Sequence, residues 1–244
     1  KGTLIGSLMR MFGEPQEQIM LGGASTVVGF MRKMGQFVNG LVWMDEYKNN
    51  LNAKIIESLK NIFDRIGYER GKKDNTFSTE STPIHSACIV SGQEMPTIEN
   101  AFFTRCMLIS LKETSFTEAQ RSEFRKLQDL EIKGLSGITV ELLRYRDLFD
   151  KQFKEVFEVE QKKLIKAVNN NEVDDRLFMN YAALIATAEL LATHVMLPFD
   201  MESFKEDVKH NLINQFATLK GSDDASKFWD VVEHLFNSCK LVED

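Results

Sequence analysis

Short apolar runs that end in polar residues dominate the first part of the chain. Residues 41–44 are four consecutive apolar residues that lead directly into Asp45 and Glu46, and residues 87–90 form a second run of this kind. Uninterrupted apolar runs of this length are typical of strands buried on both faces of a parallel sheet. A third run, residues 106–109, predicts one more strand.

Helical patterns precede and separate these runs. Apolar residues share one helical face over residues 4–12, and residues 25–34 favour a second short helix. Residues 55–66 repeat apolar positions at spacings of three and four, which predicts an amphipathic helix. Strands that alternate with helices indicate a parallel α/β sheet with flanking helices, which we expect to occupy residues 1–112.

The pattern changes near Lys112, after which the sequence contains no strand candidate. Thr117 and Gln120 form a capping box that opens a helix. Further amphipathic patterns follow, and residues 177–197 are apolar nearly all round, which is typical of a buried central helix. Residues 113–244 are therefore expected to form an all-α C-terminal domain.

Composition limits the classes of function. The chain of 244 residues has a formal net charge of −6, so any contact with nucleic acid must be a local basic feature. Its three cysteines form no CxxC pair, which favours a reducing compartment, here the cytoplasm, and argues against structural zinc. No apolar run is long enough for a membrane span, so we expect no membrane partner.

The two carboxylates after the first run are the main candidates for chemistry. Open α/β sheets bind their ligands at the C-terminal ends of the strands, and a buried strand that ends in Asp-Glu has the form of a Walker B motif. In such a motif Asp45 would help to hold Mg²⁺ near the phosphates of ATP, and Glu46 would orient and polarise the attacking water. The alternative is a core strand whose last residues happen to be acidic.

Polar residues also accompany the other two predicted strands. Residues 91–94 follow the second run, and Gln93 is the candidate for sensing the γ-phosphate, although it alternatively caps the strand end. Arg105 precedes the third run, from where it could reach a nucleotide held by an adjacent subunit. A structural ion pair is the alternative role for Arg105, and Arg70 is the alternative arginine for this contact.

These features, in this order, resemble the later half of an AAA+-type ATPase, with Walker B, sensor 1 and an arginine finger. The opening Lys1-Gly2-Thr3 resembles the end of a P-loop written Gly-Lys-Gly-Thr, which implies that Lys1 meets the β- and γ-phosphates and that Thr3 supplies a hydroxyl toward Mg²⁺. Gly2 stands where this motif usually has Ser or Thr. The glycine-rich part of the loop would lie upstream, so the chain is expected to be a piece of a longer protein. This piece alone is expected to bind ATP poorly and to be inactive, because the missing loop supplies most of the backbone N–H groups that bind the phosphates.

A closer resemblance covers about residues 1–112. Residues 43–49, 63–73 and 89–96 resemble the helicase region of primase–helicase proteins from phages and mobile elements of Bacteroides-like bacteria. Helicases of this superfamily-3-like kind carry a β-hairpin before sensor 1 that projects basic residues into a DNA channel. The resemblance implies that Lys72 and Lys73 contact phosphates there without reading sequence; the alternative is an ordinary solvated turn.

The expected function is therefore that of an ATP-driven DNA helicase or translocase, with ATP and Mg²⁺ as cofactors and single-stranded DNA as partner. Arg105 would act in trans, which requires a homo-oligomeric ring, expected to be a hexamer. Two other classes stay open: a regulatory P-loop ATPase switch whose helical half binds a protein, and a vestigial, inactive ATPase that serves as an interaction module.

Overall fold

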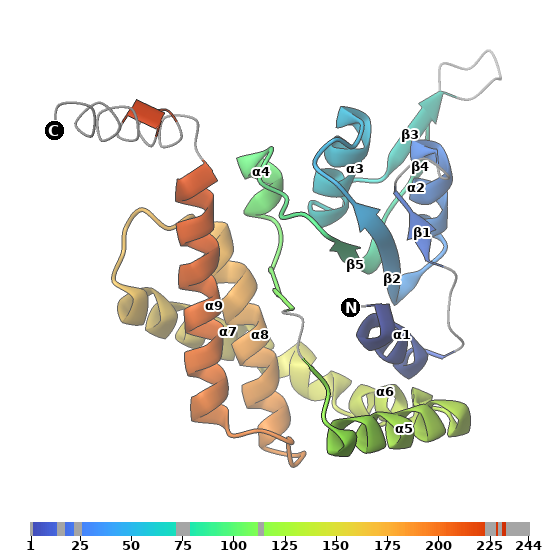
Figure 1. The fold of residues 1–244 in the computed structure, drawn as a ribbon, viewed down its shortest axis with the longest axis vertical. Coiled ribbons are helices and arrows are strands. Elements are labelled where there is room, and N and C mark those ends of the chain that lie inside the picture. The colour runs from blue at the N-terminus through green and yellow to red at the C-terminus, as the bar shows by residue number, and fades with distance from the viewer. Residues whose placement is uncertain are drawn as a thin grey trace, which may run out of the picture. The chain divides into compact units, whose positions relative to one another are not determined.

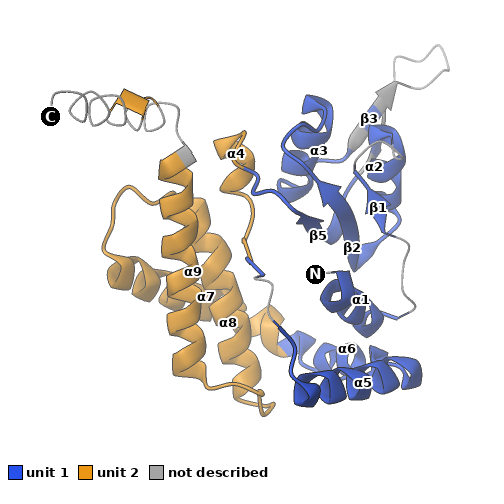
Figure 2. Cartoon of the chain, viewed as in Figure 1, with its two compact units in different colours: residues 1–96, 110–147 blue, residues 97–109, 148–244 orange. Residues whose placement is uncertain are grey.

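The computed structural model describes residues 2–13, 18–21, 26–71, 79–111, 115–222, 228 and 231–232. It is a mixed α/β structure, with a three-stranded parallel sheet, flanking helices and a helical C-terminal part (Figure 1). Two compact units divide the chain (Figure 2): unit 1 comprises residues 1–96 and 110–147, and unit 2 comprises residues 97–109 and 148–244.

The sheet of unit 1 confirms the two predicted strands that carry the candidate site. Its strand order is β1-β2-β5, with β1 at Ile19–Met20, β2 at Val38–Tyr47 and β5 at His85–Gly92, and both pairings are parallel. Val42 and Met44 of β2 are fully buried, as the apolar run predicts. The edge strand β1 was not predicted, because a strand of two residues has no periodicity to detect.

The helices of unit 1 follow the apolar patterns closely. The first three are α1 at Gly2–Met11, α2 at Val27–Gly35 and α3 at Ala53–Phe63. The side chain of Thr26 caps the first turn of α2, and the side chain of Asn52 caps that of α3, each by accepting a hydrogen bond from a backbone N–H. Helix α3 buries four apolar residues of its predicted stripe: Ile55, Ile56, Leu59 and Ile62.

A two-stranded antiparallel pair lies between α3 and β5. Strands β3 (Tyr68–Gly71) and β4 (Thr79–Thr82) pair from Tyr68 opposite Thr82 to Gly71 opposite Thr79. An antiparallel strand pair therefore stands at the place in the sequence where the resemblance implies a β-hairpin. Lys72 and Lys73, the proposed DNA contacts, fall between the paired strands and lie outside the described residues.

Helices α5 (Glu118–Lys133) and α6 (Ser136–Leu143) belong to unit 1. Two bonds hold α5 to α1: Ser7 donates a hydrogen bond to the Glu131 carboxylate, and Arg10 lies 3.6 Å from the same carboxylate. The Thr139 hydroxyl of α6 donates to the Met11 carbonyl oxygen at the end of α1. This division differs from the one expected at residue 112, because these polar contacts join the two helices to the sheet unit.

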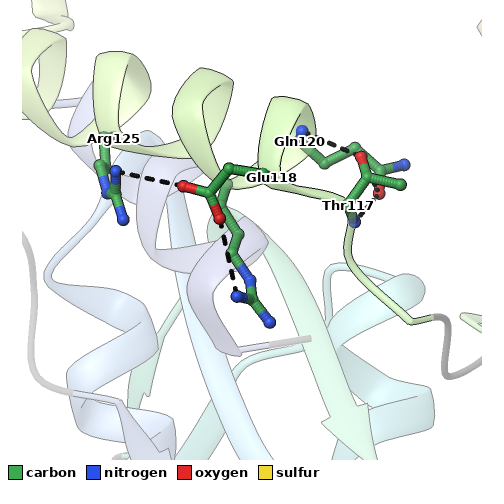
Figure 3. A network of polar contacts seen from close by, with 5 residues as sticks. Thr117, Glu118, Gln120 and Arg125 are labelled. Carbon is green, nitrogen blue, oxygen red and sulfur yellow. Dashed lines mark hydrogen bonds and ion pairs between the residues drawn. The ribbon is translucent and has the colours of Figure 1, made fainter.

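The predicted capping box starts α5 (Figure 3). The Thr117 hydroxyl accepts from the Gln120 backbone N–H, and the Gln120 side chain accepts from the Thr117 N–H. Glu118 lies between Arg121 and Arg125, with N–O distances of 3.7 and 3.6 Å. A carboxylate in the first turn is favourable because the helix N-terminus carries partial positive charge.

The described residues of unit 2 form helices and the segments that connect them, without a strand. It contains α4 at Asn100–Phe103, most of α7 at Arg146–Val168, α8 at Asp175–Ala192 and α9 at Met201–Ser222. Ten buried residues on α7–α9 and the loop before α8 form its core: Leu164, Val173, Leu177, Phe178, Tyr181, Ala182, Ile185, Val208, Leu212 and Phe216. Helix α8 is the predicted central helix, although it ends at Ala192, before Pro198. No helix in the described part of the chain is long and apolar enough to span a membrane.

The third predicted strand is wrong. Residues 106–109 form an irregular segment after α4, because their backbone groups bond to a side chain of α9 instead of a neighbouring strand. The Gln215 amide donates to the carbonyl oxygens of Phe103 (3.1 Å) and Cys106 (2.9 Å) and accepts from the Leu108 N–H (3.1 Å). The apolar run therefore docks on the helical core of unit 2.

Candidate functional site

The C-terminal ends of β2 and β5 lie side by side because the strands are parallel. Met44 pairs with Val90 and Tyr47 pairs with Gly92, with a register shift between the two pairs. Two residues of β2, Asp45 and Glu46, therefore stand opposite one residue of β5. This is the arrangement of a β-bulge, a device that re-aims side chains and is frequent beside active sites.

The bulge changes the face to which Glu46 belongs. Strict alternation from the buried residues Val42 and Met44 would place Glu46 on the buried side. Instead Glu46 is exposed, and the next residue, Tyr47, is buried at 4% exposure. Glu46 adopts a φ of 64°, a left-handed conformation that is unfavourable for a residue with a side chain. The backbone thus accepts strain where it turns a carboxylate out of the sheet.

Gly92 allows the two strands to approach at this point. A Cβ added at Gly92 would lie 2.5 Å from the carbonyl oxygen of Tyr47 and 2.8 Å from its Cβ. No side chain fits in that space without moving one of the strands. The glycine after Ser91 is therefore a packing requirement of the bulged strand end.

Asp45 is joined to β5 through Ser91. The Ser91 hydroxyl donates to Asp45 Oδ1 at 2.5 Å and accepts from Trp43 Nε1 at 2.8 Å. Ser91 is buried, whereas Trp43 and Asp45 are half-buried. The sequence pattern indicates the polar segment 91–94 and, within it, Gln93 as the candidate. The contact made by Ser91 depends on strand register, which the sequence pattern alone does not give.

The loops after β2 and β5 are also connected. The Asn49 backbone N–H donates to Glu94 Oε2 at 2.6 Å. Gln93, the predicted sensor, is an exposed residue of the bend between Gly92 and Glu94. The structure thus brings Asp45, Glu46 and the polar segment after β5 to the same end of the sheet.

The first turn of α1 lies against the same strand end. A Cβ added at Gly2 would lie 3.7 Å from Cη2 of Trp43, the residue whose indole bonds to Ser91. Thr3, the predicted hydroxyl donor, follows Gly2 and is exposed. Lys1 lies outside the described residues. The N-terminus of a helix favours anions because its first backbone N–H groups have no partner within the helix and its dipole end is positive.

Arg105 belongs to unit 2 and stands in the turn that ends α4, not before a strand. Its Nη1 donates to the Ala101 carbonyl oxygen at 2.8 Å. The residues on either side are fixed by the helical core: the Asn180 amide donates to the Thr104 carbonyl oxygen, and the Gln215 amide donates to that of Cys106. The predicted arginine finger, Arg105, therefore belongs to the helical unit 2.

Comparisons of this chain with protein-family models, with curated proteins and with solved structures found no match.

The donors at the strand ends are carboxylate and hydroxyl oxygens, which are the ligands that Mg²⁺ prefers. Among the described residues, no group of three or more His, Cys, Asp or Glu side chains is placed to hold a metal ion. Mg²⁺ at nucleotide sites is typically bound by one or two carboxylates together with waters and substrate phosphates.

Proposed function

We propose that this chain carries the catalytic strand ends of an ATP-driven DNA helicase or translocase. The observation that supports this most is the β-bulge after Met44, which gives the two carboxylates different surroundings. Asp45 is anchored to the neighbouring strand through Ser91, whereas Glu46 is exposed at a strained backbone position. One carboxylate is thus held for a cation, and the other is presented to solvent and substrate.

The residues have distinct roles in this proposal. When bound, Mg²⁺-ATP supplies the bond that is cleaved and a cation that neutralises phosphate charge. Asp45 faces that cation, with Thr3 as a second oxygen donor and Lys1 on the phosphates. Glu46 orients a water molecule and accepts its proton, which is the role of a positioned general base. Gln93 contacts the γ-phosphate.

Arg105 is proposed to act on the nucleotide of an adjacent subunit in a hexameric ring. An arginine finger stabilises charge that develops in the transition state, so Arg105→Ala should leave ATP binding intact and reduce turnover. Mixing Arg105→Ala subunits with Glu46→Gln subunits should restore part of the activity. No restoration, together with loss of ATP binding by Arg105→Ala, would indicate a structural arginine instead.

DNA is the proposed partner because of the β3–β4 pair. In the sequence, Lys72 and Lys73 follow β3 and precede β4, two strands that pair with each other, in a chain whose net charge is negative. Lysines that contact phosphates give affinity without base preference, and that affinity falls with salt because counterions are released.

The test is ATP hydrolysis by the intact protein with and without single-stranded DNA. We expect stimulation by DNA in the wild type, and none in the Lys72→Ala/Lys73→Ala variant with an unchanged basal rate. The salt dependence of DNA binding should weaken by a log–log slope of about 0.7 for each lysine lost from a phosphate contact. ATP hydrolysis that DNA never stimulates would favour the regulatory switch, and absence of nucleotide binding would favour the vestigial module.

A further inference from the structure

We propose that Tyr47 and Gly92 are positioning residues that hold Glu46 outside the sheet, in a backbone conformation that a glutamate otherwise avoids. This inference rests on the proposed function, in which Glu46 is the general base. It goes beyond that function because it assigns the orientation of the base to a buried ring and a glycine, which the pattern of polar strand ends does not mark.

The conformation of Glu46 has no local explanation. Among the described residues other than glycine, a positive φ is found at Asn39, Glu46, Arg65 and Asn169. Asparagine tolerates the left-handed region because its short polar side chain can bond locally. Arg65 follows the end of α3, and a left-handed residue commonly closes a helix. Neither explanation applies to Glu46, which lies within β2, at a bulge where a left-handed residue is usually glycine.

The residues on both sides of Glu46 fix its backbone. Before it, the Asp45 carbonyl oxygen accepts a hydrogen bond of 3.0 Å from the N–H of Leu21, which is fully buried. After it, Tyr47 is buried and pairs with Gly92 of β5. Glu46 therefore cannot leave the left-handed region unless one of its neighbours moves.

Burial of Tyr47 offsets the strain at Glu46. Strict alternation along β2 would place the carboxylate on the buried side and the tyrosine ring outside. The bulge exchanges the two, so a large apolar ring is buried and the charged group stays solvated, both of which are favourable. Gly92 makes the exchange possible, because a Cβ at that position would lie 2.5 Å from the Tyr47 carbonyl oxygen. The same packing that buries Tyr47 thus orients the carboxylate of Glu46.

The first experiment measures kcat and KM for ATP hydrolysis by the intact protein. Tyr47→Leu and Gly92→Ala should each lower kcat at least about tenfold with an unchanged KM, because they displace the base and leave the phosphate contacts in place. Tyr47→Phe keeps the buried ring and should retain the wild-type kcat. Leu59→Ala is the control for lost stability: it removes a buried side chain of α3 in the same unit and should not change kcat.

The second experiment tests the strain without nucleotide, by comparing thermal unfolding midpoints. Glu46→Gly should unfold about 2 °C higher than Glu46→Ala, because the left-handed penalty that glycine avoids exceeds the usual cost of glycine in a strand. Val38 is the matched control, since it is an exposed residue of the same strand whose φ is not positive. There the order should be reversed, with Val38→Gly unfolding below Val38→Ala.

The outcomes separate this inference from the function on which it rests. Hydrolysis by Glu46→Gln at the wild-type rate means that the proposed function itself fails. If Glu46→Gln is slow but Tyr47→Leu and Gly92→Ala keep the wild-type kcat, the positioning roles are refuted. They are also refuted if Leu59→Ala lowers kcat as much as those two variants do. A Glu46→Gly midpoint no higher than that of Glu46→Ala would show that the position is unstrained, which overturns the proposal.

Discussion

Two polar clusters in this molecule use their hydrogen-bonding capacity differently. In unit 2, the buried Gln215 amide uses both of its hydrogens on the Phe103 and Cys106 carbonyl oxygens, and its oxygen accepts from the Leu108 N–H and the Tyr181 hydroxyl. At the strand ends of unit 1, Asp45 Oδ1 accepts from the Ser91 hydroxyl, and Glu46 is exposed at a strained bulge. A saturated buried cluster indicates a structural role, whereas an exposed carboxylate such as that of Glu46 is accessible to a ligand.

The largest effect on stability should come from the saturated cluster. Gln215→Ala would leave four polar partners without their bond, two of them on the buried residues Phe103 and Tyr181, so we expect unit 2 to lose about 3 kcal/mol of its free energy of unfolding. The control is Asn214→Ala at the exposed neighbouring position, which should change stability by less than about 0.5 kcal/mol. Denaturant titrations of both variants measure the difference. Equal effects would show that the Gln215 cluster does not hold residues 103–108.

Gly92→Ala tests whether the bulged strand end is tightly packed. The added methyl would meet the Tyr47 backbone at 2.5 Å, so we expect a loss of about 1–3 kcal/mol in unit 1. Gly6→Ala is the matched control, because a Cβ at Gly6 in α1 would meet no atom within 4 Å. A helical Gly→Ala change of this kind should stabilise by about 0.5–1 kcal/mol. A neutral Gly92→Ala would mean that β2 and β5 are farther apart at this point than described.

The stability that the Gln215 cluster contributes should depend on pH through the hydroxyl of Tyr181. Burial raises the pKa of Tyr181 to about 12 from an unperturbed 10.0. The folded state therefore holds the phenolic proton longer than the unfolded state, so this stability is complete below pH 10 and is lost as the pH rises through about 12. Tyr181→Phe should cost about 1 kcal/mol at neutral pH for the lost hydrogen bond.

The measurement is the free energy of unfolding of both proteins across this alkaline range. The difference between wild type and Tyr181→Phe should shrink as the pH rises above 10. A difference that stays constant would show that the hydroxyl titrates alike in the folded and unfolded states.

Local patterns predicted most elements of this fold. The apolar runs at 41–44 and 87–90 became β2 and β5, and the capping box at Thr117 starts α5. The strand predicted at residues 106–109 was wrong because the run is as apolar as a strand. Its backbone instead bonds to Gln215, which is more than one hundred residues away in the sequence. Local composition carries no information about a partner at that distance.

The site was predictable to a smaller extent than the fold. The sequence pattern placed Asp45 and Glu46 at a strand end, where β2 now has them. It did not show the bulge, because strict alternation would have buried Glu46. Nor did it identify Ser91 and Trp43, since their contacts depend on the register between β2 and β5. Register is set by packing across the sheet.

The most direct test of the account compares Glu46→Gln with Glu94→Gln in the intact protein, measuring ATP affinity and the rate of hydrolysis. Both changes remove one exposed carboxylate at the same end of the sheet, and the glutamine oxygen at position 94 can still accept from the Asn49 N–H. We predict that Glu46→Gln binds ATP normally but hydrolyses it at least about one hundredfold more slowly, because an amide cannot accept the proton of water. Glu94→Gln should retain activity. Hydrolysis by Glu46→Gln at the wild-type rate, or an equal loss in both variants, would contradict the assignment of Glu46 as the catalytic carboxylate.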